Sequence, residues 1–188
     1  SKMRIISGSL KGQKLFTPEN KLIRPTSDRA REMIFSTLNS ILEDQDKSRM
    51  TVLDGFCGTG SLGIESFSRG FKSITFIDNS QDSIELVKKN CSKFKIQKEC
   101  SFIIMDLNNS NTDFKKKFNF DIFFLDPPYK KKIIKNCLEL LIKHRWVSKG
   151  SLRIIELAKD QSIGDLEGFE LIKKKKIGIS VFYFLKIP

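Results

Sequence analysis

Four consecutive residues in the second half of the chain have the types and order of a site that binds an amino group. Asp126-Pro127-Pro128-Tyr129 directly follows the apolar run at 121–125. Because neither proline has an amide N–H, the turn offers carbonyl oxygens and the Asp126 carboxylate as acceptors. Such acceptors suit a planar NH2 group, and Tyr129 adds an aromatic face on which a base stacks. We therefore predict that these four residues are catalytic, holding a nucleobase amine for attack on an electrophilic methyl group.

A glycine-rich turn lies earlier in the chain, between an apolar run and a helix-like segment. Gly58, Gly60 and Gly63 have the spacing GxGxxG, which is typical of loops that bind a nucleoside cofactor. Two cofactors use such a loop, a nicotinamide dinucleotide and S-adenosylmethionine. Asp54 closes the preceding strand, where a carboxylate repels a pyrophosphate but attracts the ammonium of a methionine moiety. This favours S-adenosylmethionine, with Phe56 as a cofactor contact or, alternatively, a packing residue.

Further acids follow the next two apolar runs. Asp78 is expected to accept hydrogen bonds from both ribose hydroxyls, and Asn79, which directly follows it, is also expected to bind the cofactor. Asp106 is expected to accept from the adenine amine, while Leu107 packs on the adenine ring. Carboxyl ends of parallel strands are where such folds bind ligands, so the recurrence of acids there supports a common cofactor site.

These residues require a sheet to position them. Short apolar runs predict strands at 51–54, 73–78, 101–104, 121–125 and 152–157, and two more at about 168–175 and 179–186. Helical patterns near 61–69, 80–94 and 131–144 lie between them. Only Ile177-Gly178 separates the last two strands, so they must form an antiparallel hairpin. The predicted fold class is α/β, a doubly wound, Rossmann-like seven-stranded methyltransferase sheet with an antiparallel last strand.

The first 45 residues have a different pattern. Segments 3–8 and 12–16 resemble short β pieces broken by glycine, and apolar residues from Ala30 to Leu42 repeat with helical spacing. Thr26 or Ser27 is available as the N-cap of that helix. We expect a basic N-terminal extension at 1–45, a β-hairpin plus a helix that contacts RNA, and a methyltransferase domain at 46–188.

Composition points to a polyanionic partner. The 188 residues include 34 Lys and Arg against 22 Asp and Glu, a net charge of +12. The four cysteines form no CxxC pair and there is one histidine, so we predict no metal site. No apolar run has the length of a membrane span and no secretory signal is visible, so we expect a cytoplasmic protein without membrane contact.

The basic residues are distributed unevenly. The lysine runs at 115–117 and 173–176 are interpreted as solvated surface. The space left outside the methyltransferase core is too small for a DNA target-recognition domain, which favours RNA. Residues expected to contact RNA are Arg4, Lys11, Arg24, Arg29, Arg31 and Lys130.

The glycine loop and the Asp126–Tyr129 motif together resemble the class I S-adenosylmethionine-dependent amino-methyltransferases. Segments 3–8, 11–12 and 24–32, with Phe35, further resemble the RsmD family of bacterial guanine-N2 methyltransferases. This resemblance implies methylation at N2 of guanine 966 in 16S ribosomal RNA. We expect a monomer, and the substrate is either naked RNA or the assembling small subunit. Tyr129 stands where many members have Phe, and residues 181–183 follow the family's closing motif only loosely.

Three other functions compete with this interpretation. A DNA adenine-N6 methyltransferase shares the Asp-Pro-Pro-Tyr motif. A nicotinamide-dependent dehydrogenase is disfavoured by Asp54 and by the same motif. A noncatalytic RNA-binding assembly factor with this fold would keep affinity for RNA and make no use of Asp126.

Overall fold

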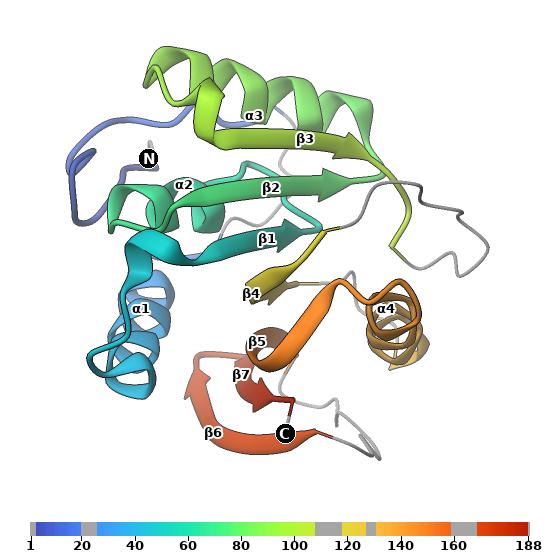
Figure 1. Cartoon of the computed structure of the whole chain (residues 1–188). Coiled ribbons are helices and arrows are strands. Elements are labelled where there is room, and N and C mark those ends of the chain that lie inside the picture. The colour runs from blue at the N-terminus through green and yellow to red at the C-terminus, as the bar shows by residue number, and fades with distance from the viewer. Residues whose placement is uncertain (1–2, 20–25, 108–117, 127–130, 159–168, 188) are drawn as a thin grey trace.

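The apolar runs form the strands of one central sheet. The computed structural model describes residues 3–19, 26–107, 118–126, 131–158 and 169–187. Within them the strand order is β3-β2-β1-β4-β5-β7-β6 (Figure 1). The strands are β1 (Thr51–Gly55), β2 (Ser73–Asp78), β3 (Cys100–Ile104), β4 (Phe120–Leu125), β5 (Val147–Ala158), β6 (Glu170–Ile177) and β7 (Ser180–Lys186).

Strand direction confirms the predicted doubly wound sheet with an antiparallel closing strand. β1 pairs in parallel with β2 and β4, β2 pairs in parallel with β3, and β4 with β5. β7 lies between β5 and β6 and is antiparallel to both. The predicted C-terminal hairpin is therefore present, and β7 is the strand whose direction is reversed.

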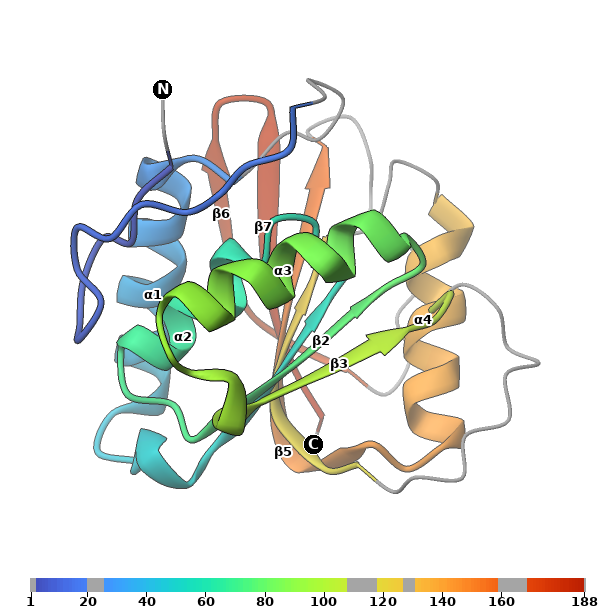
Figure 2. The same cartoon turned by 90° about the horizontal axis from the view of Figure 1, so that it is seen from above.

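Helices cover both faces of the sheet (Figure 2). Four α-helices are described: α1 (Asp28–Leu42), α2 (Ser61–Ser68), α3 (Gln81–Lys93) and α4 (Lys131–Lys143). Two 3-10 turns, η1 (Lys47–Arg49) and η2 (Gln97–Glu99), precede β1 and β3. The first three helices pack on one face and α4 on the other. None of the described helices has the length and apolar character needed to cross a membrane.

Each face of the sheet has its own apolar core. On the face of α1 to α3, Phe35 meets Phe124 edge to face, with ring centroids 5.7 Å apart. On the face of α4, Trp146 is 1% exposed and packs against Phe118 and Phe120. Ile5 belongs to the first core, so the N-terminal segment and the sheet share one apolar interior.

Two elements differ from the sequence-based expectation. β5 begins at Val147 and continues through Gly150, because a register shift on β4 between Phe120 and Ile122 accommodates the extra residues. The N-terminal β pieces reduce to a single bridge between Arg4 and Lys14. Two amides of the segment bond to a side chain of α2 rather than to a strand, which keeps the hairpin from extending.

That side chain is Glu65. Its carboxylate accepts the amide N–H groups of Ile6 (2.8 Å) and Ser7 (3.2 Å). It also accepts from the guanidinium groups of Arg31 (3.3 Å) and Arg69 (3.1 Å). Glu65 is fully buried, so these four donors compensate for the loss of hydration of its charge. The N-terminal segment, α1 and α2 are thereby joined at one point.

Replacing Glu65 with Ala should destabilise the fold by about 3–5 kcal/mol, because it leaves two amides without their acceptor and the buried Arg31 guanidinium with only the exposed Asp28 as its ion-pair partner. Urea unfolding monitored by circular dichroism measures this. Glu32→Ala is the matched control, since Glu32 is 57% exposed where it pairs with Arg69 and its removal should cost less than about 1 kcal/mol. Equal costs for the two variants would contradict the assigned role of Glu65.

Candidate functional site

The candidate site lies at the carboxyl edge of the sheet, between β1 and β4. The crossovers through α2 and α3 lie on one face and the crossover through α4 lies on the other, so the winding reverses between these two strands. Open α/β sheets bind ligands in the crevice at such a point. Asp54 is in β1 near its carboxyl end, and Asp126 directly follows β4. The residues predicted to bind the cofactor and the substrate amine therefore lie at the same edge of the sheet.

The glycine loop joins β1 to α2 through backbone conformations that glycine favours. Gly58 and Gly60 have φ values of 53° and 75°. A Cβ on Gly60 would lie 2.9 Å from the methyl groups of Val87, and one on Gly63 would lie 2.4 Å from the Phe76 ring. The three glycines therefore allow both the turn and close packing of α2 and α3 on the sheet.

Phe56 also has a positive φ of 56°, which is unfavourable for a residue with a side chain. Its partly buried ring packs against the core on the α4 face. The structure thus supports the packing interpretation of Phe56, and cofactor contact stays a prediction.

Asp54 is 3% exposed and its carboxylate accepts the N–H of Gly63 at 2.9 Å. Burial raises the pKa of Asp54 to about 8; the Gly63 N–H acts in the opposite direction, and the nearby Asp78 carboxylate raises the pKa further. The carboxylate thus fixes the first turn of α2 and sits where a cation would stabilise its ionised form. Its predicted contact with an ammonium group stays a prediction.

Asp78 connects the glycine loop to the start of α3. One carboxylate oxygen accepts the N–H of Gly58 at 3.1 Å, and the other accepts the N–H of Ser80 at 2.9 Å. The side chain is only partly buried, and Asn79 beside it is exposed. The geometry places both at the carboxyl edge of the sheet (the ligand edge), as predicted, with Asp78 held in position by two backbone donors.

The residues after β3 divide between surface and core. Asp106 is exposed, and the preceding Met105 donates its N–H to the carbonyl of Asp78 at 2.9 Å, which places Asp106 beside the β2 end. Leu107 is 1% exposed and belongs to the core on the α4 face. The prediction that Leu107 packs on an adenine ring is wrong, because the chain turns inward after Asp106 and buries this side chain.

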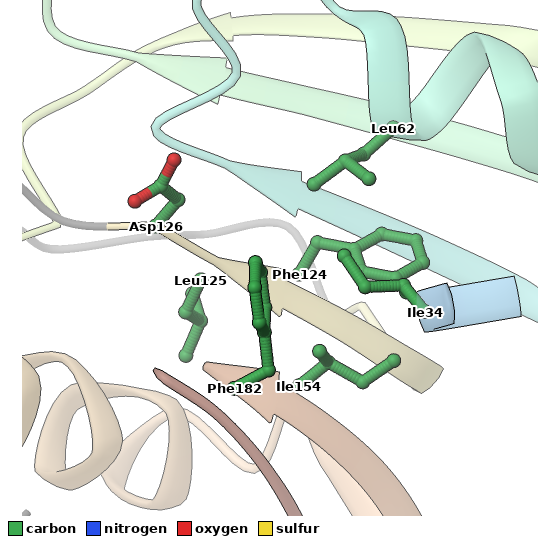
Figure 3. A pocket seen from close by; sticks show the side chains of 7 residues that line it. All are labelled: Ile34, Leu62, Phe124, Leu125, Asp126, Ile154 and Phe182. Carbon is green, nitrogen blue, oxygen red and sulfur yellow. The ribbon is translucent and has the colours of Figure 1, made fainter. Parts of the chain in front are cut away.

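Asp126 lies beside a narrow apolar pocket (Figure 3). The other residues that line this pocket are Ile34, Leu62, Phe124, Leu125, Ile154 and Phe182. They come from α1, α2, β4, β5 and β7, so the pocket connects the face of the sheet that α1 to α3 cover with the end of β4. The other predicted catalytic residues, Pro127, Pro128 and Tyr129, lie outside the described residues.

The predicted RNA contacts separate into several groups. Arg4 and Lys11 are exposed on the N-terminal hairpin, and Arg29 is exposed in the first turn of α1. Arg24 and Lys130 lie outside the described residues.

The prediction for Arg31 is wrong. Its side chain is fully buried and ion-paired with Asp28 and Glu65, so its guanidinium group supports the fold instead of meeting a phosphate.

Two positioning residues were missed by sequence reasoning. Asn90 is fully buried on α3 and exchanges two hydrogen bonds with the backbone of Phe16, at 2.7 and 3.0 Å. Its amide also reaches the carbonyl of Thr59 in the glycine loop, at 3.4 Å. Glu65 is the second. It lies among the apolar residues of 62–67, and this position was the signal by which it could have been found.

Comparison with known proteins places the chain in a family. The family model described as conserved hypothetical protein 95 matches residues 3–186. Ribosomal RNA small subunit methyltransferase D of Haemophilus influenzae is 34% identical over 181 residues, which cover 94% of this chain and 90% of that protein. The chain belongs to the RsmD family. The protein of the same name from Buchnera aphidicola (from Acyrthosiphon pisum) is 35% identical over 93% of this chain and 88% of its own length.

Solved structures agree with membership of the RsmD family. A putative methylase from H. influenzae has a TM-score of 0.78 at 29% identity, covering 100% of this chain and 99% of that one. A putative methyltransferase from Escherichia coli has a TM-score of 0.83 at 25% identity, covering 100% and 98%. A putative methyltransferase complexed with SAH shares the fold at 14% identity, with a TM-score of 0.59 over 80% of this chain and 48% of that one. The Rossmann-like methyltransferase fold predicted from sequence is thereby confirmed.

The raised pKa of Asp54 predicts a pH-dependent stability. The folded protein holds a proton on this carboxyl up to about pH 8, whereas the unfolded chain releases it near pH 4. The unfolding free energy should therefore fall as pH rises between these values, by on the order of 1 kcal/mol per pH unit from this group. Asp54→Asn keeps an acceptor for Gly63 and should flatten the fall between pH 5 and pH 8.

Urea unfolding at a series of pH values measures the two slopes. Asp82→Asn is a suitable control, because Asp82 is exposed on α3. Identical slopes in the Asp54 variant and the unmodified protein would show that Asp54 is ionised in the folded state at neutral pH.

Proposed function

We propose that this protein transfers a methyl group from S-adenosylmethionine to the exocyclic N2 of a guanine in small-subunit (16S) ribosomal RNA. By the family resemblance the target is guanine 966, and the enzyme acts as a monomer. The observation that carries the proposal is the position of Asp126 at the end of β4, beside an apolar pocket and on the same edge as Asp54 and Asp78. The name shared by its relatives, ribosomal RNA small subunit methyltransferase D, supports the substrate class.

The residues at the edge fit S-adenosylmethionine better than a dinucleotide. Asp78 brings a carboxylate close to the glycine loop, where it would repel a pyrophosphate and attract a cation. Asp54 adds a carboxyl group whose ionised form a sulfonium or an ammonium would stabilise and a pyrophosphate would not. Asp78 and Asn79 would hold the ribose, and Asp106 would accept from the adenine amine. When bound, the cofactor supplies an electrophilic methyl group. Binding of its cation favours the ionised form of Asp54, whose charge is otherwise disfavoured by burial.

Asp126 is the residue that we propose acts on the substrate amine. Its carboxylate accepts a hydrogen bond from the guanine amine, which orients the nitrogen and directs its lone pair toward the electrophile. From the sequence, the two prolines that follow leave carbonyls as further acceptors, and Tyr129 offers a stacking surface. The proton leaves after methyl transfer, because the charged product nitrogen is acidic. Positioning therefore provides most of the proposed acceleration.

Exposed arginine and lysine side chains are proposed to bind the RNA phosphates. Arg29 lies in the first turn of α1, whose residue Ile34 lines the pocket beside Asp126. Arg4 and Lys11 would bind phosphates farther along the N-terminal hairpin, and Arg24 and Lys130 are proposed from sequence alone. Such contacts position the substrate without reading its sequence.

One experiment separates this function from its competitors. Purified protein with labelled S-adenosylmethionine is given unmodified 16S RNA, assembling small subunits or duplex DNA, and the products are mapped by mass spectrometry. We expect one methyl group on guanine N2 in RNA. Methyl groups on adenine N6 in duplex DNA would favour the DNA methyltransferase alternative, and RNA binding without any transfer would favour an assembly factor.

Asp126→Asn should lower kcat at least a hundredfold, because the amide no longer offers a charged acceptor to the substrate amine. The affinity for S-adenosylmethionine, measured by calorimetry, should change less than threefold, since the cofactor contacts are assigned to β1, β2 and β3. Unchanged turnover would rule out the proposed role of Asp126.

Arg29→Ala should weaken RNA binding and leave cofactor binding intact. Loss of one phosphate contact on a single strand lowers the slope of log affinity against log salt by about 0.7. Fluorescence anisotropy at several salt concentrations measures this slope. Arg49→Ala, an exposed arginine at the amino end of the sheet, is the control and should keep the slope of the unmodified protein.

A further inference from the structure

The β6–β7 hairpin extends beyond Asp126 at the ligand edge. Leu125 of β4 pairs with Ile155 of β5, and Ile155 pairs with Tyr183 of β7. Asp126 is therefore level with the residue before Tyr183, which is Phe182. The hairpin turn at Ile179 lies three residues farther along, or roughly 10 Å at about 3.3 Å per residue, and two strand spacings, again roughly 10 Å, to the side. These are distances that one or two nucleotides span.

Four lysines line the outer strand of this hairpin. Lys173, Lys174, Lys175 and Lys176 are all exposed, and none forms an ion pair with a residue that the structure describes. The ammonium of Lys174 lies 5.5 Å from the centroid of the Tyr183 ring. The result is a row of uncompensated positive charge that runs toward the ligand edge.

The register places one of these lysines beside the pocket. Lys175 pairs with Phe182, and opposite residues in an antiparallel pair project to the same face of the sheet. Phe182 lines the pocket next to Asp126. Lys175 therefore lies on the pocket's face of the sheet, one strand outward from it.

An exposed apolar residue occupies the hairpin turn. Ile179 is 60% exposed and follows Gly178, whose φ of 58° forms the tight turn. A single exposed isoleucine is common on protein surfaces. Beside four exposed lysines on the strand before it, however, it provides an apolar contact next to phosphate-binding groups, the combination that binds unpaired nucleotides.

We propose that the β6–β7 hairpin binds the RNA strand directly adjacent to the target nucleotide. Lys175 contacts a backbone phosphate and Ile179 packs against a neighbouring unpaired base. The proposal rests on the proposed function, because it takes the position beside the Asp126 carboxylate as the place where the target base binds. It assigns a role to the lysine run that composition alone marked as solvated.

Edge protection is the competing explanation for these lysines. β6 is the last strand of the sheet, and lysines on edge strands prevent pairing with other chains. That role needs a charge of either sign, whereas binding to phosphate needs a positive one. Charge reversal therefore separates the two explanations.

The test is Lys175→Glu in steady-state methylation of 16S RNA. We expect KM for RNA to rise about tenfold or more, with KM for S-adenosylmethionine unchanged. Lys98→Glu is the matched control, because it makes the same charge change at an exposed position in η2, at the opposite edge of the sheet. Lys175→Gln and Ile179→Ala should each raise KM for RNA about threefold, and thermal unfolding checks that each variant is folded.

The outcomes distinguish this inference from the proposed function. If the unmodified protein methylates no RNA, the proposed function fails. If it methylates RNA and Lys175→Glu has the same KM for RNA as Lys98→Glu, the hairpin does not bind RNA. The lysines then serve only to prevent the edge strand β6 from pairing with other chains. If Lys175→Glu does not fold, the RNA KM of Lys175→Gln decides, and an unchanged value overturns the proposal.

Discussion

The arrangement of the candidate site depends on a buried carboxylate, that of Glu65. Removing this charge from water is costly, and four donors from the N-terminal segment, α1 and α2 offset the cost. Because the donors come from three parts of the chain, the carboxylate is satisfied only when all three are assembled. Gly60 of the glycine loop is the N-cap of α2, so the same interaction fixes the N-terminal segment relative to the proposed cofactor site.

A second polar group strengthens this connection. Asn90 pairs with the backbone of Phe16 as a neighbouring strand would, and also reaches the glycine loop at Thr59. The N-terminal segment is thus held at Ile6 and at Phe16, and its apolar side chains join the core of the sheet. The predicted boundary at residue 45 is therefore not a break in packing. A cation on this segment is fixed in position with respect to the proposed cofactor site.

The fold was largely predictable because its signals are local. An apolar run ends where a strand ends, so Asp78, Asp106 and Asp126 were placed at the correct edge from sequence alone. Ser27 was one of two N-cap candidates, and it accepts the N–H of Ala30 at 3.2 Å. β5 was shortened in the prediction because glycine normally interrupts a strand, whereas Gly150 lies inside one that shifts register.

The errors in the candidate site come from contacts that are distant in sequence. Arg31 has the sequence context of its exposed neighbour Arg29, and the difference between them is a partner 34 residues away, Glu65. Leu107 follows an acid at a strand end, and whether its side chain faces the surface or the core depends on how the chain turns after β3. Helical and strand periodicity carry no information on either point, because both are decided by tertiary packing.

The ligand edge separates charges of opposite sign. Acids lie at or just after the carboxyl ends of β1 to β4, while Arg29 and the lysines of β6 lie outside the pocket. A polyanion is repelled by ionised carboxylates and attracted to these cations, whereas a cationic methyl donor has the opposite preference. The net charge of +12 therefore describes two regions with opposite electrostatic roles. Asp126 and the apolar side chains around it lie between the two regions, where the uncharged part of an RNA, a single base, experiences neither preference strongly.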